Sequence, residues 1–298
     1  MRSTPWQDRP PWDILWVFAY PSDPRRTTRS CQSRLAEWTT VIRTHVPLLS
    51  QPQATVLALW SVGMGRARSC ALTAVAVLLA GWLHRQEQTV RQQLRECGDE
   101  VEAKRGVPRQ ALAVEPCVGP LRRWVLRGWQ GTQVALALDA PTVGTRFTVL
   151  AISVVSRGCA MPVAWTILPA TVPHAWRREW LRLLRPLRPA IPKPWTVIVL
   201  ADRGLSAGWL FRRRVRLGWQ PFWRINRGGT FRPDPQATYR PWLRVVPQPG
   251  TRWRGTGTAF KSPQRRLRCT RLACWAEGDQ DPWLILTALP PDASEAGW

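Results

Sequence analysis

The chain has 298 residues and a formal net charge of +24, from 43 Lys and Arg against 19 Asp and Glu. Hydrophobic residues make up 45% of it, enough to form a sizeable core, which excludes a wholly disordered protein. The positive charge favours a polyanionic partner, either a nucleic acid or a membrane surface. G/C-rich coding DNA is a second explanation for the many arginines and for the 20 tryptophans, because their codons are rich in G and C.

The apolar segments and the cysteines bear on where the protein resides. The longest uncharged apolar run, Cys70–Leu83, is shorter than the roughly 20 residues that cross a bilayer, so no transmembrane helix is predicted. The stretch Ile14–Tyr20 follows Asp8 and Asp13, unlike a secretory signal. The seven cysteines include no CxxC pair. We therefore predict a cytoplasmic protein with reduced cysteines and no membrane partner.

Composition divides the chain into four segments. Residues 1–45 are a poorly defined lead-in that begins rich in Pro and Arg, and residues 46–119 have the apolar spacing of helices. Residues 120–225 alternate between predicted strands and helices. Residues 226–298 are basic, rich in Gly and Pro, and contain short predicted strands.

The helical segment contains the outline of a helix-turn-helix. The apolar run Ala71–Leu83 is followed by the polar run His84–Arg95, in which Val90 and Leu94 are spaced to pack inward. In that outline the residues that face a DNA groove are Gln88, Thr89, Arg91, Gln92 and Arg95. An ordinary helical hairpin with a solvated charged face explains the same pattern.

Three strands and a helix are predicted in the first part of the third segment, after a short candidate helix at Leu121–Leu126. Val134–Leu138 reads as a buried strand that ends at Asp139. Arg146–Val155 and Cys159–Leu168 are β-branched runs that form a hairpin, and His174–Leu187 has the spacing of an amphipathic helix.

The same segment continues with a further strand, a helix and a last strand. Trp195–Leu200 is uninterrupted and apolar, which is typical of a central strand covered on both faces, and it is followed by Asp202. Ser206–Leu217 is a basic helix, and Gln220–Ile225 a short strand. The order strand-strand-strand-helix-strand-helix-strand predicts a mixed sheet with helices, an α/β architecture.

The last segment reads as a β-rich basic insertion. Its predicted strands are Thr251–Phe260, Arg265–Ala276 and Pro282–Leu289. Arginines crowd these strands, and the candidates for phosphate contact are Arg252, Arg254, Arg266 and Arg268. A merely solvated basic face is the alternative.

Asp139 and Asp202 each follow an apolar strand. An ionised carboxylate there is costly unless it is hydrogen-bonded or bound to a cation, and ligands of open α/β sheets bind at the carboxyl ends of the strands. If the two strands are neighbours, Mg²⁺ or Mn²⁺ between the carboxylates would relieve their repulsion and could clamp a phosphodiester. Alternatively, either residue merely caps a helix or closes a turn.

Several segments resemble bacterial insertion-sequence transposases of the DDE class, of the insertion-sequence-four type. They are Leu136–Asp139, Phe147–Ser153, Pro162–Trp165, Thr196–Gly204 and Gly250–Phe260. The resemblance runs from about Pro47 to the last residue. It implies a ribonuclease-H-like catalytic domain with a β insertion, and it makes Asp139 and Asp202 the first two metal-binding acids.

The resemblance also implies an activity and its partners. Mg²⁺ or Mn²⁺ would support hydrolysis of a phosphodiester at the transposon end, followed by attack of the free 3′-hydroxyl on target DNA. The expected partners are the transposon ends, the target DNA and a second copy of the chain in a synaptic complex, in a protein associated with the bacterial nucleoid. Arg203, next to Asp202, could hold a phosphate bidentately or form a structural salt bridge.

The chain departs from the family at its third acid, a Glu on a helix after the insertion, within a Tyr…Arg…Glu…Lys signature. No Tyr follows Tyr239, and Glu295 lies too near the last residue for an anchored helix. The other late acids, expected in a polar turn between two insertion strands, are Glu277, Asp279 and Asp281. We therefore expect a chain truncated before its third acid, with one face of the sheet uncovered and little or no strand transfer.

Two other functions remain open from the sequence. One is a non-catalytic DNA-binding remnant that occupies transposon ends. The other is a ribonuclease-H-like nuclease that uses its two acids alone.

Overall fold

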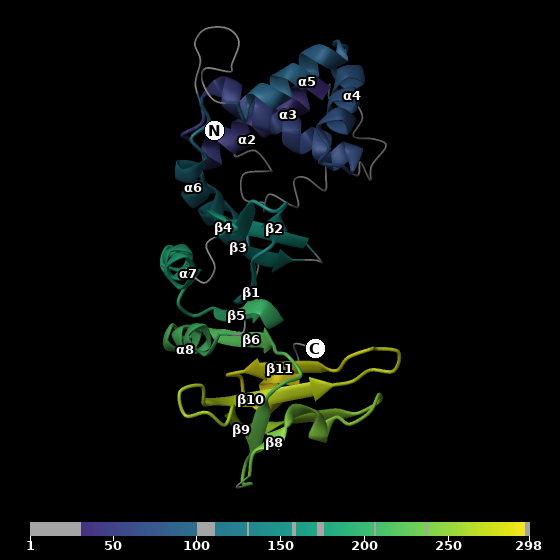
Figure 1. Cartoon of the computed structure of the whole chain (residues 1–298). Coiled ribbons are helices and arrows are strands. Elements are labelled where there is room, and N and C mark those ends of the chain that lie inside the picture. Colours follow the sequence, from purple (N-terminus) through teal and green to yellow (C-terminus); the bar gives the residue numbers. More distant parts are fainter. Residues whose placement is uncertain are drawn as a thin grey trace. The chain divides into compact units, whose positions relative to one another are not determined.

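The computed structural model describes residues 31–99, 111–129, 131–156, 159–171, 176–205, 207–236 and 238–295. The chain forms two compact units, Met1–Gln130 and Gly131–Trp298 (Figure 1). The first unit is helical where it is described, and the second contains a large mixed sheet with helices. The predicted α/β class is confirmed. The first thirty residues, predicted as a loose lead-in, lie outside the described residues.

The first unit contains α2 (Cys31–His45), α3 (Gln51–Ala67), α4 (Leu72–Leu83), α5 (Glu87–Glu96) and α6 (Val114–Arg127). Helix α3 begins at a capping box, in which the Gln53 side chain accepts a hydrogen bond from the Ser50 N–H at 2.9 Å and the Ser50 hydroxyl accepts one from the Gln53 N–H. Helices α3 and α4 are each followed by a residue in the left-handed conformation, Arg68 and His84, which ends the helix.

Helices α2 and α6 show where the predicted segment boundaries differ from the structure, although α6 contains the candidate helix Leu121–Leu126. Helix α2 falls inside the expected lead-in of residues 1–45, yet its Trp38 and Ile42 are buried in one cluster with Val62 of α3. Trp124 of α6 joins this cluster, 5.7 Å from the Trp38 ring. The predicted boundary follows Gly119. This contact ties α6 to the helical unit, and the two units divide after Gln130.

Helices α4 and α5 occupy the two segments of the predicted helix-turn-helix. Val90 and Leu94 of α5 are 1% and 2% exposed and pack with α4, so their predicted inward orientation is confirmed. The Trp60 indole of α3 donates a hydrogen bond to the Leu94 carbonyl at 3.1 Å, which joins α5 to a third helix. The opposite side of α5 carries its polar residues.

The second unit is built on a single sheet. Its first part contains β1 (Gln133–Asp139), β2 (Thr142–Val143), β3 (Phe147–Ser156), β4 (Cys159–Pro169), α7 (Trp176–Leu184), β5 (Thr196–Ala201), α8 (Gly208–Arg216) and β6 (Gln220–Arg224). Strands β3 and β4 form the predicted antiparallel hairpin, and β1 is antiparallel to β3. Strand β5 lies between β1 and β6, parallel to both, as expected for a central strand.

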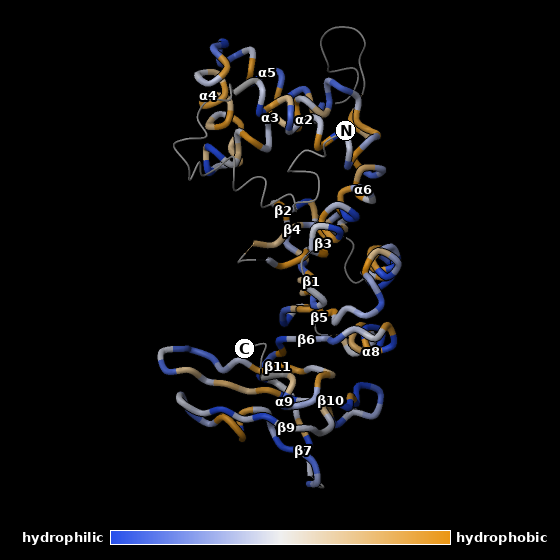
Figure 2. The backbone as a smooth tube through the Cα atoms, turned by 180° about the vertical axis from the view of Figure 1, so that it is seen from behind, coloured by the Kyte–Doolittle hydropathy of each residue, from blue (hydrophilic) through white to orange (hydrophobic). Residues whose placement is uncertain are grey.

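The two faces of this sheet differ in their cover. Alternate residues of a strand point to opposite faces, and on one face Leu136 and Val199 are fully buried. Helix α8 lies against this face beside β6 (Figure 2), with Phe211 edge-on to Trp223 at 5.3 Å. On the other face Leu200 is only half-buried. The prediction that both faces of the central strand are covered is therefore wrong for the described residues, where α7 and α8 pack on one face.

The insertion continues the same sheet. It contains β7 (Thr230–Pro233), β8 (Arg240–Pro241), β9 (Arg252–Ala259), β10 (Leu267–Cys274), β11 (Trp283–Thr287) and α9 (Pro291–Glu295). The order across the sheet is β2-β3-β1-β5-β6-β11-β10-β9-β7-β8, with β4 paired to β3 as well. Because β11 pairs with β6, the end of β11 at Trp283 lies at the same edge of the sheet as the carboxyl ends of β1, β5 and β6.

An arginine occupies the core of the insertion. Arg271 of β10 is 1% exposed, and its guanidinium carbon lies 5.5, 4.9 and 5.4 Å from the ring centroids of Phe231, Trp242 and Trp253. It donates a hydrogen bond to the Trp242 carbonyl. Burial lowers the pKa of Arg271 to about 9. The aromatic faces compensate part of the cost of removing this cation from water.

Candidate functional site

Asp139 and Asp202 lie side by side at the carboxyl edge of the sheet. Asp139 is the last residue of β1, and Asp202 directly follows β5. The two strands are parallel neighbours with Leu138 paired to Ala201, so the next residues along are the two aspartates. Ionised carboxylates in this position repel each other unless a cation compensates them. The expected juxtaposition is therefore present in the backbone register.

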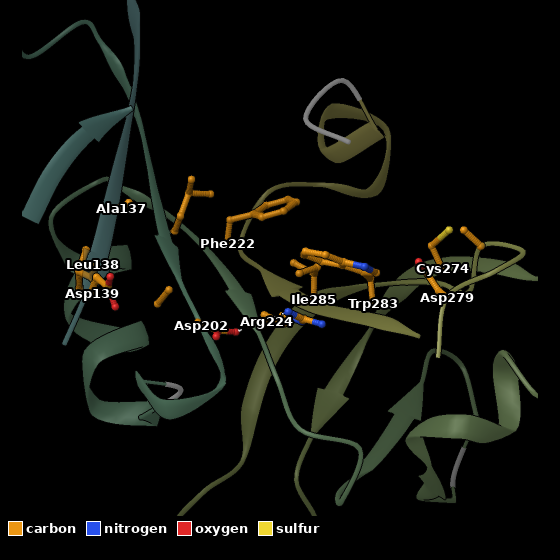
Figure 3. A pocket seen from close by; sticks show the side chains of 13 residues that line it. Ala137, Leu138, Asp139, Asp202, Phe222, Arg224, Cys274, Asp279, Trp283 and Ile285 are labelled. Carbon is orange, nitrogen blue, oxygen red and sulfur yellow. Dashed lines mark ion pairs between the residues drawn. The ribbon is translucent and has the colours of Figure 1, made fainter. Parts of the chain in front are cut away.

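Both aspartates line a groove with a volume of about 770 Å³ on the half-open face of the sheet (Figure 3). The floor is apolar and includes Ala137, Leu200 and Phe222. Its wall on the insertion side is formed by residues of β10, β11 and the turn between them, Cys274, Ala276, Asp279, Trp283 and Ile285. The groove thus combines an apolar floor with carboxylates along one edge, a combination common in ligand sites.

The protein partners of the two carboxylates are few. The Asp139 Oδ1 atom accepts a hydrogen bond from the Ala140 N–H at 2.8 Å, as in a turn closed by its own side chain. The Asp202 side chain is 72% exposed, and Arg224 Nη1 lies 4.0 Å from its Oδ1 atom. An exposed contact at this distance contributes about 0–1 kcal/mol. Asp202 is therefore accessible to a ligand.

Arg224 is held between this carboxylate and an aromatic ring. It is the last residue of β6, and its guanidinium carbon lies 4.1 Å from the Trp283 ring centroid. Its Nε atom is buried and has no hydrogen-bond partner among the described residues. Sequence reasoning missed Arg224, although its place at the end of the next parallel strand was a usable signal.

Two carboxylates are the donor set that the described residues offer to a metal. Mg²⁺ binds oxygen ligands and often takes one or two carboxylates together with phosphate oxygens of the substrate. Asp139 and Asp202 suit that mode, because both are exposed and neighbouring. Across the described ranges no group of three or more His, Cys, Asp or Glu side chains lies close enough to hold a metal ion.

The acidic turn between β10 and β11 lies at the same edge. Asp279 lines the groove, and Asp281 contacts both Arg203, at 3.6 Å, and Arg227. The sequence left two roles open for Arg203, phosphate binding and a structural salt bridge. The structure contains the salt bridge, with Asp281. The sequence predicts the polar turn but not its position near Asp202, because that position depends on the pairing of β11 with β6.

The candidate DNA-contacting residues of α5 share its outer side. Arg91 and Arg95 are exposed, whereas Val90 and Leu94, each next to one of them in sequence, are buried. The polar members of the set are Gln88 and Thr89, which are exposed, and Gln92, which is half-buried. The Gln92 amide donates a hydrogen bond to Glu96 at 2.6 Å. All five side chains predicted to face DNA are therefore at least partly exposed to solvent.

The insertion arginines are not equivalent. Arg252 and Arg254 are exposed on β9, and Arg254 lies 3.7 Å from Asp292. Arg268 instead forms a bidentate pair with Asp234, with both nitrogen–oxygen distances 2.6 Å. Arg266 lies before β10, and its Nε atom donates to the Lys261 carbonyl at 3.2 Å. Arg268 is therefore held within the insertion by an acid that sequence reasoning did not assign to it.

No single helix in the described part of the chain is long and apolar enough to cross a membrane. The pair α3 and α4 passes the length and composition test only when taken together, across a bend of 99°.

Comparisons with known proteins give similarities to solved structures but no family. No protein-family model matches the chain, and no curated protein matches it. Among solved structures, the chain is similar to the piggyBac transposase synaptic complex with hairpin DNA, with a TM-score of 0.36 and 10% sequence identity. The match covers 94% of this chain, which spans 61% of that chain.

Proposed function

We propose that the chain is a DNA transposase of the DDE class whose second unit is a ribonuclease-H-like domain. The observation that carries the proposal is the placement of Asp139 and Asp202 at the ends of two neighbouring parallel strands. The sheet supports it, because β4, β3 and β1 are successive antiparallel neighbours and β1, β5 and β6 are parallel neighbours.

In this proposal the two carboxylates hold Mg²⁺ or Mn²⁺ together with a phosphate of the DNA. The bound cation would supply a Lewis acid that polarises the phosphodiester. Asp139 and Asp202 orient the site, and Arg224, at 4.0 Å from Asp202, adds a fixed positive charge beside the phosphate. The apolar floor of the groove keeps water away from one side of the reacting group.

DNA binding in this proposal begins with α5. Its exposed Arg91 and Arg95 contact the duplex, and the +24 charge of the chain adds affinity that does not depend on sequence. Arg252, Arg254 and Arg266 supply further phosphate contacts, and two copies of the chain assemble on paired transposon ends. Arg203 and Arg268 are proposed to act through their ion pairs with Asp281 and Asp234 and not by direct contact.

We infer that strand transfer by this chain is weak or absent, since the described residues bring two acids together and not three. The same observation favours a second candidate function, a DNA-binding remnant that occupies transposon ends without cutting them.

Nicking of supercoiled plasmid DNA in Mg²⁺ separates these functions. The enzyme hypothesis predicts slow nicking by the wild type that disappears in Asp139→Asn and in Asp202→Asn, with Asp99→Asn in the first unit as the matched control. Equal nicking by all four proteins contradicts the hypothesis. If the wild type binds DNA without nicking it, the remnant is supported.

Retention of DNA tests the binding role of α5. Arg91→Gln combined with Arg95→Gln is expected to weaken binding and to reduce the salt slope of log Kd by about 2, because each lost phosphate contact removes about 0.9 from that slope. The control is Arg34→Gln together with Arg43→Gln on α2. Equal effects of both pairs would contradict a specific role for α5.

A further inference from the structure

A hydrogen-bonded hairpin extends past the carboxyl edge of the sheet beside Asp139. Strand β2 pairs with the start of β3, Thr142 with Thr148 and Val143 with Phe147. Two backbone hydrogen bonds brace it, from the Val149 N–H to the Pro141 carbonyl at 2.9 Å and from the Ala170 N–H to the Arg146 carbonyl at 2.8 Å. Gly144 at its turn has a φ of +57°, which favours glycine. The hairpin is therefore held on both sides.

Large apolar side chains project from this hairpin into solvent. Val143 is 55% exposed and Phe147 is 41% exposed, and the two form a cross-strand pair. Ile167 of β4, paired with Val149, is 60% exposed. We call Val143, Phe147 and Ile167 the apolar patch. Exposed apolar residues that cluster in this way mark interaction sites more often than isolated ones do.

The apolar patch lies on the face of the sheet that carries Asp139. Asp139 pairs with Ala151, and Phe147 lies four residues before Ala151 on β3, so both side chains point to the same face. At about 3.3 Å per residue, Phe147 lies roughly 13 Å from the position level with Asp139. That distance corresponds to about four base-pair steps of duplex DNA at 3.4 Å each.

Charge identifies the kind of partner. The Arg146 guanidinium lies 5.5 Å from the centroid of the Phe147 ring, so a cation accompanies the apolar patch. A hydrophobic protein surface is a poor match for a ring that carries an exposed arginine within a chain of +24. An apolar side chain flanked by a cation suits a nucleic acid, in which unstacked base faces are apolar and the adjoining phosphates are anionic.

We propose that the apolar patch is a wedge that unstacks a base step of DNA within about four base pairs of the phosphodiester held at Asp139 and Asp202. Phe147 and Val143 contact the separated bases, and Arg146 contacts the adjacent phosphate. Unstacking costs a few kcal/mol per step and is compensated by these contacts. The inference rests on the proposed function, since it places DNA at the two aspartates.

Fluorescence of 2-aminopurine tests the wedge in the full chain. The probe is a set of 30-base-pair duplexes, each with 2-aminopurine at one position near a blunt end, titrated in Ca²⁺ to prevent cleavage. The wild type is expected to raise the fluorescence severalfold at one or two adjacent positions. Phe147→Ser and Val143→Ser should lose this rise while fluorescence anisotropy reports DNA binding within a factor of two or three of the wild type.

Val215→Ser is the matched control, because Val215 is 45% exposed on α8, which packs on the opposite face of the sheet. This variant should keep the full rise. Binding without a rise at any position, or a full rise in Phe147→Ser, overturns the wedge and leaves the proposed function intact. A chain that binds no duplex overturns both. If Phe147→Ser converts a wild-type dimer into a monomer in sedimentation with unchanged fluorescence, the patch is an interface between copies and the wedge is wrong.

Discussion

Charged residues in two regions of the second unit differ in how they are paired. We call strands β7 to β10 the insertion end and the carboxyl ends of β1, β5 and β6 the acid edge. At the insertion end, Arg271 is enclosed by aromatic rings, and Asp234 is paired with Arg268 and with the Thr256 hydroxyl. At the acid edge, Asp202 is 72% exposed, with one cation at 4.0 Å. A charge with partners in the protein is held in place by them, whereas a charge left exposed beside a second like charge is available to a ligand. The charges paired within the insertion are thus distinguished from the two carboxylates that remain accessible to a ligand.

The largest expected effect is a loss of stability at the insertion end. Trp242 is 0% exposed, so Trp242→Ala leaves a cavity and should cost about 3–5 kcal/mol in the free energy of unfolding. Trp283→Ala at the acid edge is the matched control, because that ring is 43% exposed and leaves no enclosed cavity. Urea denaturation measures the free energy of unfolding of both variants. Equal losses would contradict the contrast between the insertion end and the acid edge.

A smaller loss is expected from an added methyl group in the insertion. A Cβ atom at Gly257 would lie 2.3 Å from the Arg232 carbonyl oxygen and 2.6 Å from the Phe231 ring. Gly257→Ala should therefore force strands β7 and β9 apart and cost about 1–3 kcal/mol. Gly204→Ala is the control, since nothing lies within 4 Å of its Cβ position. A neutral Gly257→Ala in thermal unfolding would show that the two strands pack less closely.

The pH dependence of stability tests the ion pair of the insertion. Hydrogen bonds from Arg268 and then from Thr256 hold the pKa of the Asp234 carboxyl below its usual value. A carboxyl group whose pKa is lowered by folding adds stability above its unfolded pKa of about 4, and this stability is lost as the pH falls through the folded pKa. We expect the free energy of unfolding to decrease on acidification below about pH 4, and less so in Asp234→Asn. If the free energy of unfolding depends on pH identically in the wild type and in Asp234→Asn, the Asp234 ion pair does not contribute to stability.

The smallest expected effect concerns Arg224. Its guanidinium competes with a divalent cation for Asp202, so Arg224→Met should tighten Mn²⁺ binding by up to about fivefold, the equivalent of an exposed ion pair. Titration calorimetry measures the change, and Arg252→Met, on β9, is the control. Weaker binding in Arg224→Met would mean that Arg224 supports the cation site and does not compete with it.

Much of the second unit could be predicted from the sequence, because its strands are short apolar runs with clear ends. The runs before Asp139 and Asp202 gave both carboxylates and their strands, and parallel pairing then brings them together. Helix α2 escaped prediction, since its apolar residues Trp38, Val41 and Ile42 are few and follow a segment rich in Pro and Arg. The ion pairs of Asp281 with Arg203 and of Asp234 with Arg268 could not be predicted, because they depend on long-range strand pairing that no local sequence pattern shows.

The prediction that the central strand is covered on both faces is wrong for the same reason. The apolar run of β5 predicts burial on both faces, but Ile198 and Leu200 are only half-buried, and Leu200 lines the groove. Local sequence reports the apolar character of a strand, and only the assembled sheet reports which helices lie against it.

Binding of Mn²⁺ tests the central claim most directly, because it does not depend on DNA or on catalysis. Electron paramagnetic resonance counts free Mn²⁺ during a titration of the wild type, Asp139→Asn, Asp202→Asn and the Asp234→Asn control. We predict saturable binding by the wild type and by Asp234→Asn, and loss of that binding in each of the other two variants. Undiminished Mn²⁺ binding in Asp139→Asn and in Asp202→Asn would contradict the claim that these two carboxylates form a cation site.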